Sequence, residues 1–241
     1  MTQTLEGKIV LVTGAAKRIG RAIALRLAAE GAQVAIHYGG SEKEAREVSD
    51  MCGGAPLFQA NLENVPEIVS MFAAIEEKLG RLDGLVNNAA RFTRFDPLEI
   101  TEKDWDFIHS VNLKATFFCC QQGAKLMRKN HNGGHIVNIS SLGGIRPWAD
   151  HVHYCASKAG VIMMTKALSK ALAPEISVNS VAPGVIPFGE WDDRMAAMVR
   201  ATPVQRPGTG DEIADAVVNF LRSSKFVTGQ ILAVDGGLSL R

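Results

Sequence analysis

The chain has 241 residues, of which 46% are hydrophobic and 21% charged, and its formal net charge is +1. This is an ordinary globular composition, and so small a charge excludes a general attraction to nucleic acid or to anionic membranes. No apolar run approaches the roughly 20 residues of a bilayer-spanning helix. The four cysteines form neither a CxxC pair nor a disulfide framework, and the opening segment MTQTLEGKIVLVTG lacks a signal-peptide layout, so we expect a cytoplasmic protein.

Apolar, strand-like runs alternate with helical patterns along the whole chain. We expect strands at 8–13, 33–37, 57–60, 84–87, 135–140, 177–182 and 230–234. Two of the intervening helices open with a capping-box pattern, Ser41 with Glu44 and Thr101 with Asp104. Repeated β-α units with apolar strands predict a single α/β domain over residues 1–241, a doubly wound parallel sheet with helices on both faces.

The first strand runs into the turn TGAAKRIG, which leads into the first helix. Such a turn approaches a dinucleotide pyrophosphate, and glycine is favoured where backbone comes close to phosphate. Gly14 and Gly20 are present, but the middle position of the expected glycine trio is Arg18.

The end of the second strand indicates which nucleotide would bind. NAD-binding proteins usually carry Asp or Glu there to hold the ribose 2′-hydroxyl, whereas this chain reads His37-Tyr38-Gly39-Gly40-Ser41. A carboxylate at this position would repel a 2′-phosphate, and none is present. Two cations on the neighbouring loop, Lys17 and Arg18, could pair with the 2′-phosphate. We therefore expect NADP(H). Ser41 is expected to cap the next helix, and a capping serine can also bind the phosphate.

A candidate catalytic group follows the fifth strand, in ISSLGGIRPWADHVHYCASKAG. Tyr154 and Lys158 are four residues apart and share a helix face. An ammonium about 4 Å from the phenol, at an effective dielectric near 20, would lower the tyrosine pKa from near 10 to roughly 7. Tyr154 would then act as general acid toward a carbonyl that receives hydride, and Ser141 would hold the carbonyl oxygen.

Together with TGAAKRIG and this serine–tyrosine–lysine spacing, the segments NNAA, VNLKATF, VNSVAPGVI and TGQILAVDGG resemble the short-chain dehydrogenase/reductase family over nearly the whole chain. The resemblance implies that Asn112 is a fourth catalytic residue, which places a water in a proton relay through Lys158. It also implies a homotetramer, built through helices at about 104–130 and 153–172 and the C-terminal strand. The coenzyme-binding residues that we expect are Gly14, Lys17, Arg18, Ile19, Gly20, His37, Tyr38, Ser41, Asn61, Leu62, Asn88, Ala89, Ala90, Tyr154, Lys158, Pro183, Gly184, Val185 and Ile186.

The substrate side carries less information. Phe92, Trp148 and Trp191 are candidate cleft residues, and Phe188 stands where the family often has a threonine. His151 and His153 have an HxH spacing without an evident third ligand, so we expect no metal.

Three functions remain open. The chain resembles the 3-oxoacyl-carrier-protein reductases, which implies NADPH-dependent reduction of a ketone that a carrier protein could present. Arg18, Phe92 and ALAPEISVNSVAPG resemble pteridine reductases instead, although Ser141 suits a carbonyl oxygen better than a pterin nitrogen. A non-catalytic, nucleotide-sensing regulator is the third hypothesis.

Overall fold

The computed structural model describes residues 4–189 and 192–241. Seven strands form one parallel sheet in the order β3-β2-β1-β4-β5-β6-β7. The strands are β1 (Ile9–Val12), β2 (Gln33–Tyr38), β3 (Leu57–Gln59), β4 (Gly84–Asn87), β5 (Gly134–Ile139), β6 (Ile176–Pro183) and β7 (Ile231–Val234). The expected doubly wound fold is confirmed, and each strand ends within one residue of its predicted position.

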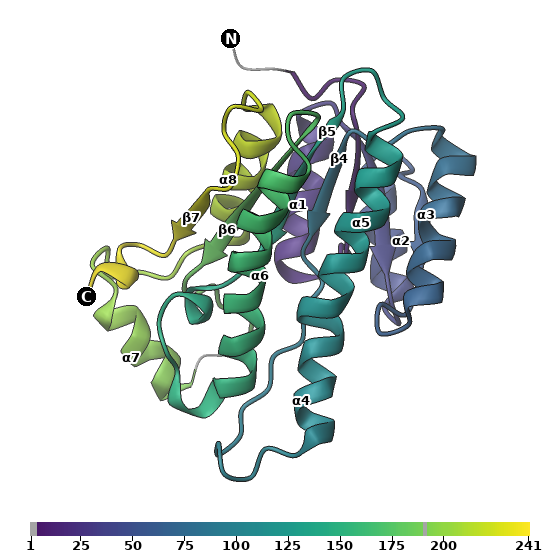
Figure 1. The fold of residues 1–241 in the computed structure, drawn as a ribbon. Helices are drawn as coiled ribbons and strands as arrows, with labels where there is room; N and C mark the ends of the chain where they lie inside the picture. The colour runs from purple at the N-terminus through teal and green to yellow at the C-terminus, as the bar shows by residue number, and fades with distance from the viewer. Residues whose placement is uncertain (1–3, 190–191) are drawn as a thin grey trace.

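Helices cover both faces of this sheet (Figure 1). The α-helices are α1 (Arg18–Ala29), α2 (Glu42–Met51), α3 (Val65–Leu79), α4 (Glu102–His109), α5 (Thr116–Met127), α6 (Val152–Ala171), α7 (Asp193–Ala201) and α8 (Gly210–Arg222). Helices α1 and α8 pack together on one face, while α3, α5 and α6 pack on the other. Short 3₁₀ turns lie at Leu142–Gly144, Ala149–His151 and Leu238–Leu240.

Two hydrophobic cores hold the layers together because successive strand residues point to opposite faces. In β2, Val34, Ile36 and Tyr38 belong to the core under α1 and α8, whereas Ala35 belongs to the core under α3 and α5. The strand order reverses between β1 and β4, and ligands of open α/β sheets bind at the carboxyl edge beside such a point. The fold therefore directs attention to the loops that follow β1, β2, β4, β5 and β6.

Candidate active site

The turn after β1 is packed too closely for side chains at its glycines. Gly14 has a φ of 62°, and a Cβ on Gly20 would collide with the Gly14 carbonyl oxygen. The Asn88 amide, just beyond β4, donates to the Thr13 carbonyl at 2.9 Å and to the Gly14 carbonyl at 3.1 Å. Backbone is thus the surface that this turn offers to a ligand.

His37, at the end of β2, fixes the same turn from the other side. Its Nδ1 accepts a hydrogen bond from the Gly14 amide at 3.0 Å, which leaves Nε2 to donate to the Ala60 carbonyl at 3.1 Å. Burial lowers the pKa of His37 to about 4, so the ring is neutral. His37 therefore holds the turn in place and contributes no positive charge.

Arg18 and Lys17 differ in what they offer to a phosphate. Arg18 is exposed and takes a left-handed backbone conformation, with φ 53°, and among the described residues it makes no ion pair. Lys17 is held by Glu44 of α2 at 2.7 Å. Because Glu44 faces Lys17, the expected capping box at Ser41 is wrong, and the Ser41 side chain makes no capping hydrogen bond. The box at Thr101 and Asp104 is confirmed.

A cavity of about 940 Å³ follows the strand ends from this turn toward Tyr154. Most of the expected coenzyme-binding residues line it: Gly14, Lys17, Arg18, Ile19, Gly20, His37, Asn61, Leu62, Asn88, Ala89, Ala90, Tyr154 and Ile186. Four of the others, Lys158, Pro183, Gly184 and Val185, line the adjoining cavity instead, and two line neither cavity. The Tyr38 side chain is buried in the core on the opposite face of β2, as strand alternation requires, and Ser41 lies outside the lining.

An adjoining cavity of about 790 Å³ contains the remaining expected residues, including Ser141, Lys158, Pro183, Gly184 and Val185. The two cavities share Arg18, Ile19, Asn88, Ala90, Phe92, Tyr154, Ile186 and Phe188. The phenol of Tyr154 is therefore placed where an elongated ligand in one cavity meets a second ligand in the other.

The polar groups around Tyr154 only partly match the sequence-based expectation. Ser141 forms the hydrogen bond with the phenol, while Lys158 Nζ donates to the Ile139 carbonyl at 2.9 Å and lies 5.9 Å from the Tyr154 ring centroid. Burial raises the pKa of Tyr154 to about 12 and lowers that of Lys158 to about 8. The expected drop in the tyrosine pKa is wrong for this state, because desolvation outweighs the hydrogen bond from Ser141 and the ammonium is turned toward the backbone.

Asn112 lies in a π-helical segment, Ser110–Ala115, between α4 and α5. Its Oδ1 accepts from the Arg91 amide at 2.7 Å, and its Nδ2 donates to the Arg91 carbonyl at 3.0 Å and to the Ser157 hydroxyl at 3.1 Å. The side chain thus joins the loop after β4 to α6 at the residue directly before Lys158. Its expected part in a water relay stays a prediction.

Aromatic rings surround the phenol on the substrate side. Phe92 stacks on His151 with centroids 4.5 Å apart and meets the Tyr154 ring edge-on at 4.8 Å. The Trp148 ring lies parallel to that of Tyr154 at 6.1 Å. Trp191, the third expected cleft residue, lies outside the described residues.

The two histidines of the HxH pair are engaged with Thr93. His151 Nδ1 bonds the Thr93 carbonyl at 2.9 Å, and His153 Nε2 bonds the Thr93 hydroxyl at 2.7 Å. Within the described residues, no cluster of three or more His, Cys, Asp or Glu side chains could hold a metal ion.

Comparison with known proteins places this architecture in a family. The family model described as enoyl-(acyl carrier protein) reductase matches residues 14–239. A short-chain dehydrogenase/reductase variant from Serratia marcescens superimposes with a TM-score of 0.92 at 30% identity, covering 98% of this chain and 100% of the other. The chain is a short-chain dehydrogenase/reductase.

Other members of the family are similar over nearly the full length. The 3-oxoacyl-[acyl-carrier-protein] reductase FabG of Staphylococcus aureus is 39% identical over 244 residues, covering 96% of this chain and 98% of the relative. The Thermotoga maritima protein of the same name is 39% identical over 247 residues, covering 97% and 98%. The angucycline C-6 ketoreductase LanV, solved with bound NADP, has a TM-score of 0.91 at 32% identity and covers 100% of this chain and 99% of its own.

One feature of this short-chain dehydrogenase/reductase has no local sequence signal. Asp150 Oδ2 accepts from Arg94 Nε and from Arg194 Nη1, both at 2.8 Å. This triad joins the loop after β4, the segment before α6, and α7, all around the substrate-side cavity. Its members are 56 and 44 residues apart in the sequence. Only the folded chain brings them together.

The described residues include no helix that is both long enough and apolar enough to cross a membrane.

Proposed function

We propose that this short-chain dehydrogenase/reductase uses NADPH to reduce the ketone of a 3-oxoacyl thioester or a similar carbonyl compound to an alcohol. The observation that carries the proposal is the position of Tyr154, which lines both cavities and is hydrogen-bonded to Ser141. A carbonyl oxygen placed against these two hydroxyls has its carbon turned toward the coenzyme cavity. Residues 1–241 would form one coenzyme-binding domain around the single sheet.

The chain's own groups fit NADP(H). The crowded turn at Gly14 and Gly20 offers backbone to a pyrophosphate. Arg18 offers a guanidinium that pairs with no carboxylate of the described residues, beside a β2 end whose sequence has no Asp or Glu. Asn61 and Leu62 would flank the adenine, and Pro183 to Ile186 the nicotinamide. The similar ketoreductase LanV is described with bound NADP. The chemistry that the coenzyme supplies when bound is donation of hydride to the carbonyl carbon.

Proton transfer falls to the residues around Tyr154. With a pKa of about 12, the phenol is protonated at neutral pH and can donate to the developing alkoxide, while Ser141 donates a second hydrogen bond to the same oxygen. Lys158, with a pKa of about 8, is mainly cationic at neutral pH and stabilises the phenolate that the transfer leaves behind. Asn112 positions α6 through Ser157 and would hold a relay water.

The ketone is favoured over a pterin by two features. Ser141 suits an oxygen acceptor, and one face of Phe92 is already covered by His151, which leaves a single face for a planar substrate. The names of the similar reductases point to thioesters presented by an acyl carrier protein. Pteridine reduction remains the second candidate because the open face of Phe92, which is 58% exposed, borders the same cavity.

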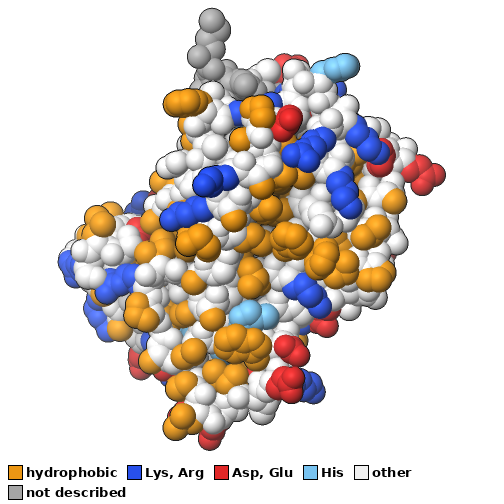
Figure 2. All heavy atoms as spheres, in the orientation of Figure 1, with side chains coloured by type: hydrophobic (Ala, Val, Ile, Leu, Met, Phe, Trp, Pro, Cys, Tyr) orange, Lys and Arg blue, Asp and Glu red, His pale blue; other side chains and the backbone are white. Residues whose placement is uncertain are grey.

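We also propose self-association through α4, α5 and α6. Figure 2 shows hydrophobic side chains gathered across this face, and the exposed ones include Trp105, Phe107, Phe117 and Met163. Exposed apolar surface of this extent is typical of an interface between subunits. A homotetramer is the expected assembly. The four cysteines are unpaired, which supports the proposed cytoplasmic location.

The test is a substrate panel with NADPH on one preparation. We expect oxidation of NADPH with an acetoacetyl thioester and none with dihydrobiopterin. A crotonyl thioester tests the enoyl reduction that the family model's description would imply. Turnover of dihydrobiopterin alone would replace the proposal with the pteridine reductase. Tight NADPH binding without turnover of any carbonyl or pterin would favour the nucleotide-sensing regulator.

A further inference from the structure

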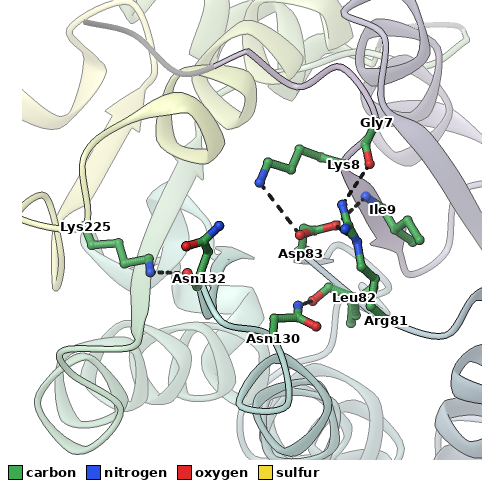
Figure 3. A network of polar contacts seen from close by, with 9 residues as sticks. All are labelled: Gly7, Lys8, Ile9, Arg81, Leu82, Asp83, Asn130, Asn132 and Lys225. Carbon is green, nitrogen blue, oxygen red and sulfur yellow. Dashed lines mark hydrogen bonds and ion pairs between the residues drawn. The ribbon is translucent and has the colours of Figure 1, made fainter.

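A separate cavity of about 340 Å³ lies at the opposite edge of the sheet, where β1, β4 and β5 begin. Its polar lining includes Lys8, Asp83, Asn132, His135 and Lys225, and none of these residues lines the coenzyme or substrate cavities. Figure 3 shows the surrounding network, with the side chain of Asn132 between the two lysines in that view. The cavity therefore belongs to no part of the proposed reaction.

Positive charge exceeds negative charge around this cavity. Among the described residues that line it, Asp83 is the only carboxylate, and its Oδ2 already accepts from the Ile9 amide at 2.9 Å and from Arg81 Nε at 3.1 Å. Its Oδ1 is 3.8 Å from Lys8 Nζ, which is a loose ion pair. The Lys225 ammonium donates to the backbone carbonyl of Asn132 and pairs with no carboxylate in the described part of the chain. The described lining thus holds one carboxylate and two ammonium groups, and Arg81 outside it also pairs with that carboxylate.

His135 contributes an imidazole ring whose Nε2 could bond a ligand in the cavity. The ring is 9% exposed, and its Nδ1 bonds the Ser177 hydroxyl at 2.8 Å. When that hydroxyl donates to Nδ1, Nε2 carries the proton and can donate it to a ligand. Burial, together with the charges of Lys225 and Lys8, lowers the pKa of His135 to about 4, while Asp83 opposes this shift. The neutral imidazole therefore lines the cavity together with the two lysine side chains.

We propose that this cavity binds the phosphate group of a small phosphorylated compound between Lys8, Lys225 and His135, with the Asn132 amide as a further donor. Ammonium groups form charge-assisted hydrogen bonds with phosphate oxygens, and each lysine has capacity left for them. The volume is several times the roughly 30 Å³ that one water occupies in the liquid, so a phosphate and a short substituent fit. The ligand would join the start of β1, the α5–β5 loop and the α8–β7 loop.

The experiment follows phosphate binding by the NMR signals of the His135 ring and by the melting temperature, at constant ionic strength. It is done in the Arg18→Ala protein, which removes one competing cation, the exposed guanidinium of the coenzyme cavity. We expect a saturable change with inorganic phosphate at a dissociation constant of about 1 mM or below. Tighter binding of glycerol 3-phosphate would show that a phosphate monoester, and not free phosphate, is the preferred ligand.

Three lysine variants identify the site. Lys8→Gln and Lys225→Gln should each weaken phosphate binding by about tenfold or more, as expected for a lost hydrogen bond between charged groups. Lys43→Gln removes the same charge from α2 and should leave the affinity unchanged. Melting temperatures without phosphate establish that the variants are folded. The proposal is overturned if no saturable change occurs. It is also overturned if the Lys8→Gln and Lys225→Gln variants bind phosphate as tightly as the parent Arg18→Ala protein.

Discussion

Arg18 combines a strained backbone with a functional side chain, and substitution can separate the two. A residue with a Cβ in the left-handed conformation is strained by about 1–2 kcal/mol. Glycine relieves that strain but gains about 0.4–1 kcal/mol of conformational freedom in the unfolded chain. Arg18→Gly should therefore be more stable than the wild type by about 1 kcal/mol, which raises the melting temperature by about 2–4 °C in a chain of this size. Arg18→Ala keeps the Cβ and should show no such gain.

Both substitutions should damage coenzyme selection equally. A hydrogen bond between charged groups contributes about 1.5–3 kcal/mol, so NADPH affinity should fall by about 10- to 150-fold. NADH affinity should change little, since NADH has no 2′-phosphate. Arg21→Ala removes a nearby cation from α1 and controls for general electrostatic attraction.

The assays are thermal unfolding and fluorescence titration of both coenzymes. The expected result is a more stable protein that has lost its preference for NADPH. If Arg18→Gly were no more stable than Arg18→Ala, the strain argument would be refuted. If both variants kept the NADPH preference, the guanidinium would have no part in it.

Three other predictions test neighbouring features. Burial lowers the pKa of Lys158 to about 8 from an ordinary 10.5, so at this residue the unfolded chain binds more protons between these values. The contribution of Lys158 to stability should therefore rise as the pH increases from 8 to 10. Chemical denaturation at several pH values measures the free energy of unfolding of Lys158→Met and of the wild type. The value for the variant should fall relative to the wild type between pH 8 and 10, and a constant difference would contradict the shifted pKa. Asp150→Asn should raise the KM for substrate about three- to tenfold with kcat nearly unchanged. The reason is that two partly exposed ion pairs of Asp150, each contributing up to about 1 kcal/mol, hold α7 and the loop after β4 in place. A fall in kcat alone would exclude this positioning role. Phe92→Ala should raise the KM for a ketone modestly, whereas efficient dihydropterin reduction that is lost in the variant would establish stacking on a pterin.

The strand positions could be predicted from the sequence because strands buried on both faces are continuous apolar runs. Local capping could be predicted only where nothing distant intervened. Thr101 and Asp104 form their capping box. Glu44 instead forms an ion pair with Lys17, which lies 27 positions before Glu44 in the chain, and so does not bond Ser41. A pattern of neighbouring residues contains no information on a distant ion-pair partner such as Lys17.

In the candidate site, too, the local sequence predicted some features, while others depend on contacts between distant residues. The spacing of Tyr154 and Lys158 correctly placed both side chains at one cavity. The sign of the tyrosine pKa shift depended instead on burial and on the Ile139 carbonyl that holds the ammonium, neither of which the spacing reveals. The π-helical segment around Asn112 and the Asp150 triad likewise depend on packing between separate elements.

The central claim is that Tyr154 is the proton donor at the junction of two cavities. The most direct measurement compares wild type with Tyr154→Phe for NADPH-dependent reduction of an acetoacetyl thioester, with NADPH affinity measured on the same samples. A general acid contributes about 10²–10⁴-fold, so turnover should fall by at least about 100-fold. NADPH affinity should stay within a small factor, because the substitution removes one hydroxyl and leaves the turn at Gly14 that would hold the pyrophosphate unchanged. Near-normal turnover in Tyr154→Phe would contradict the assignment.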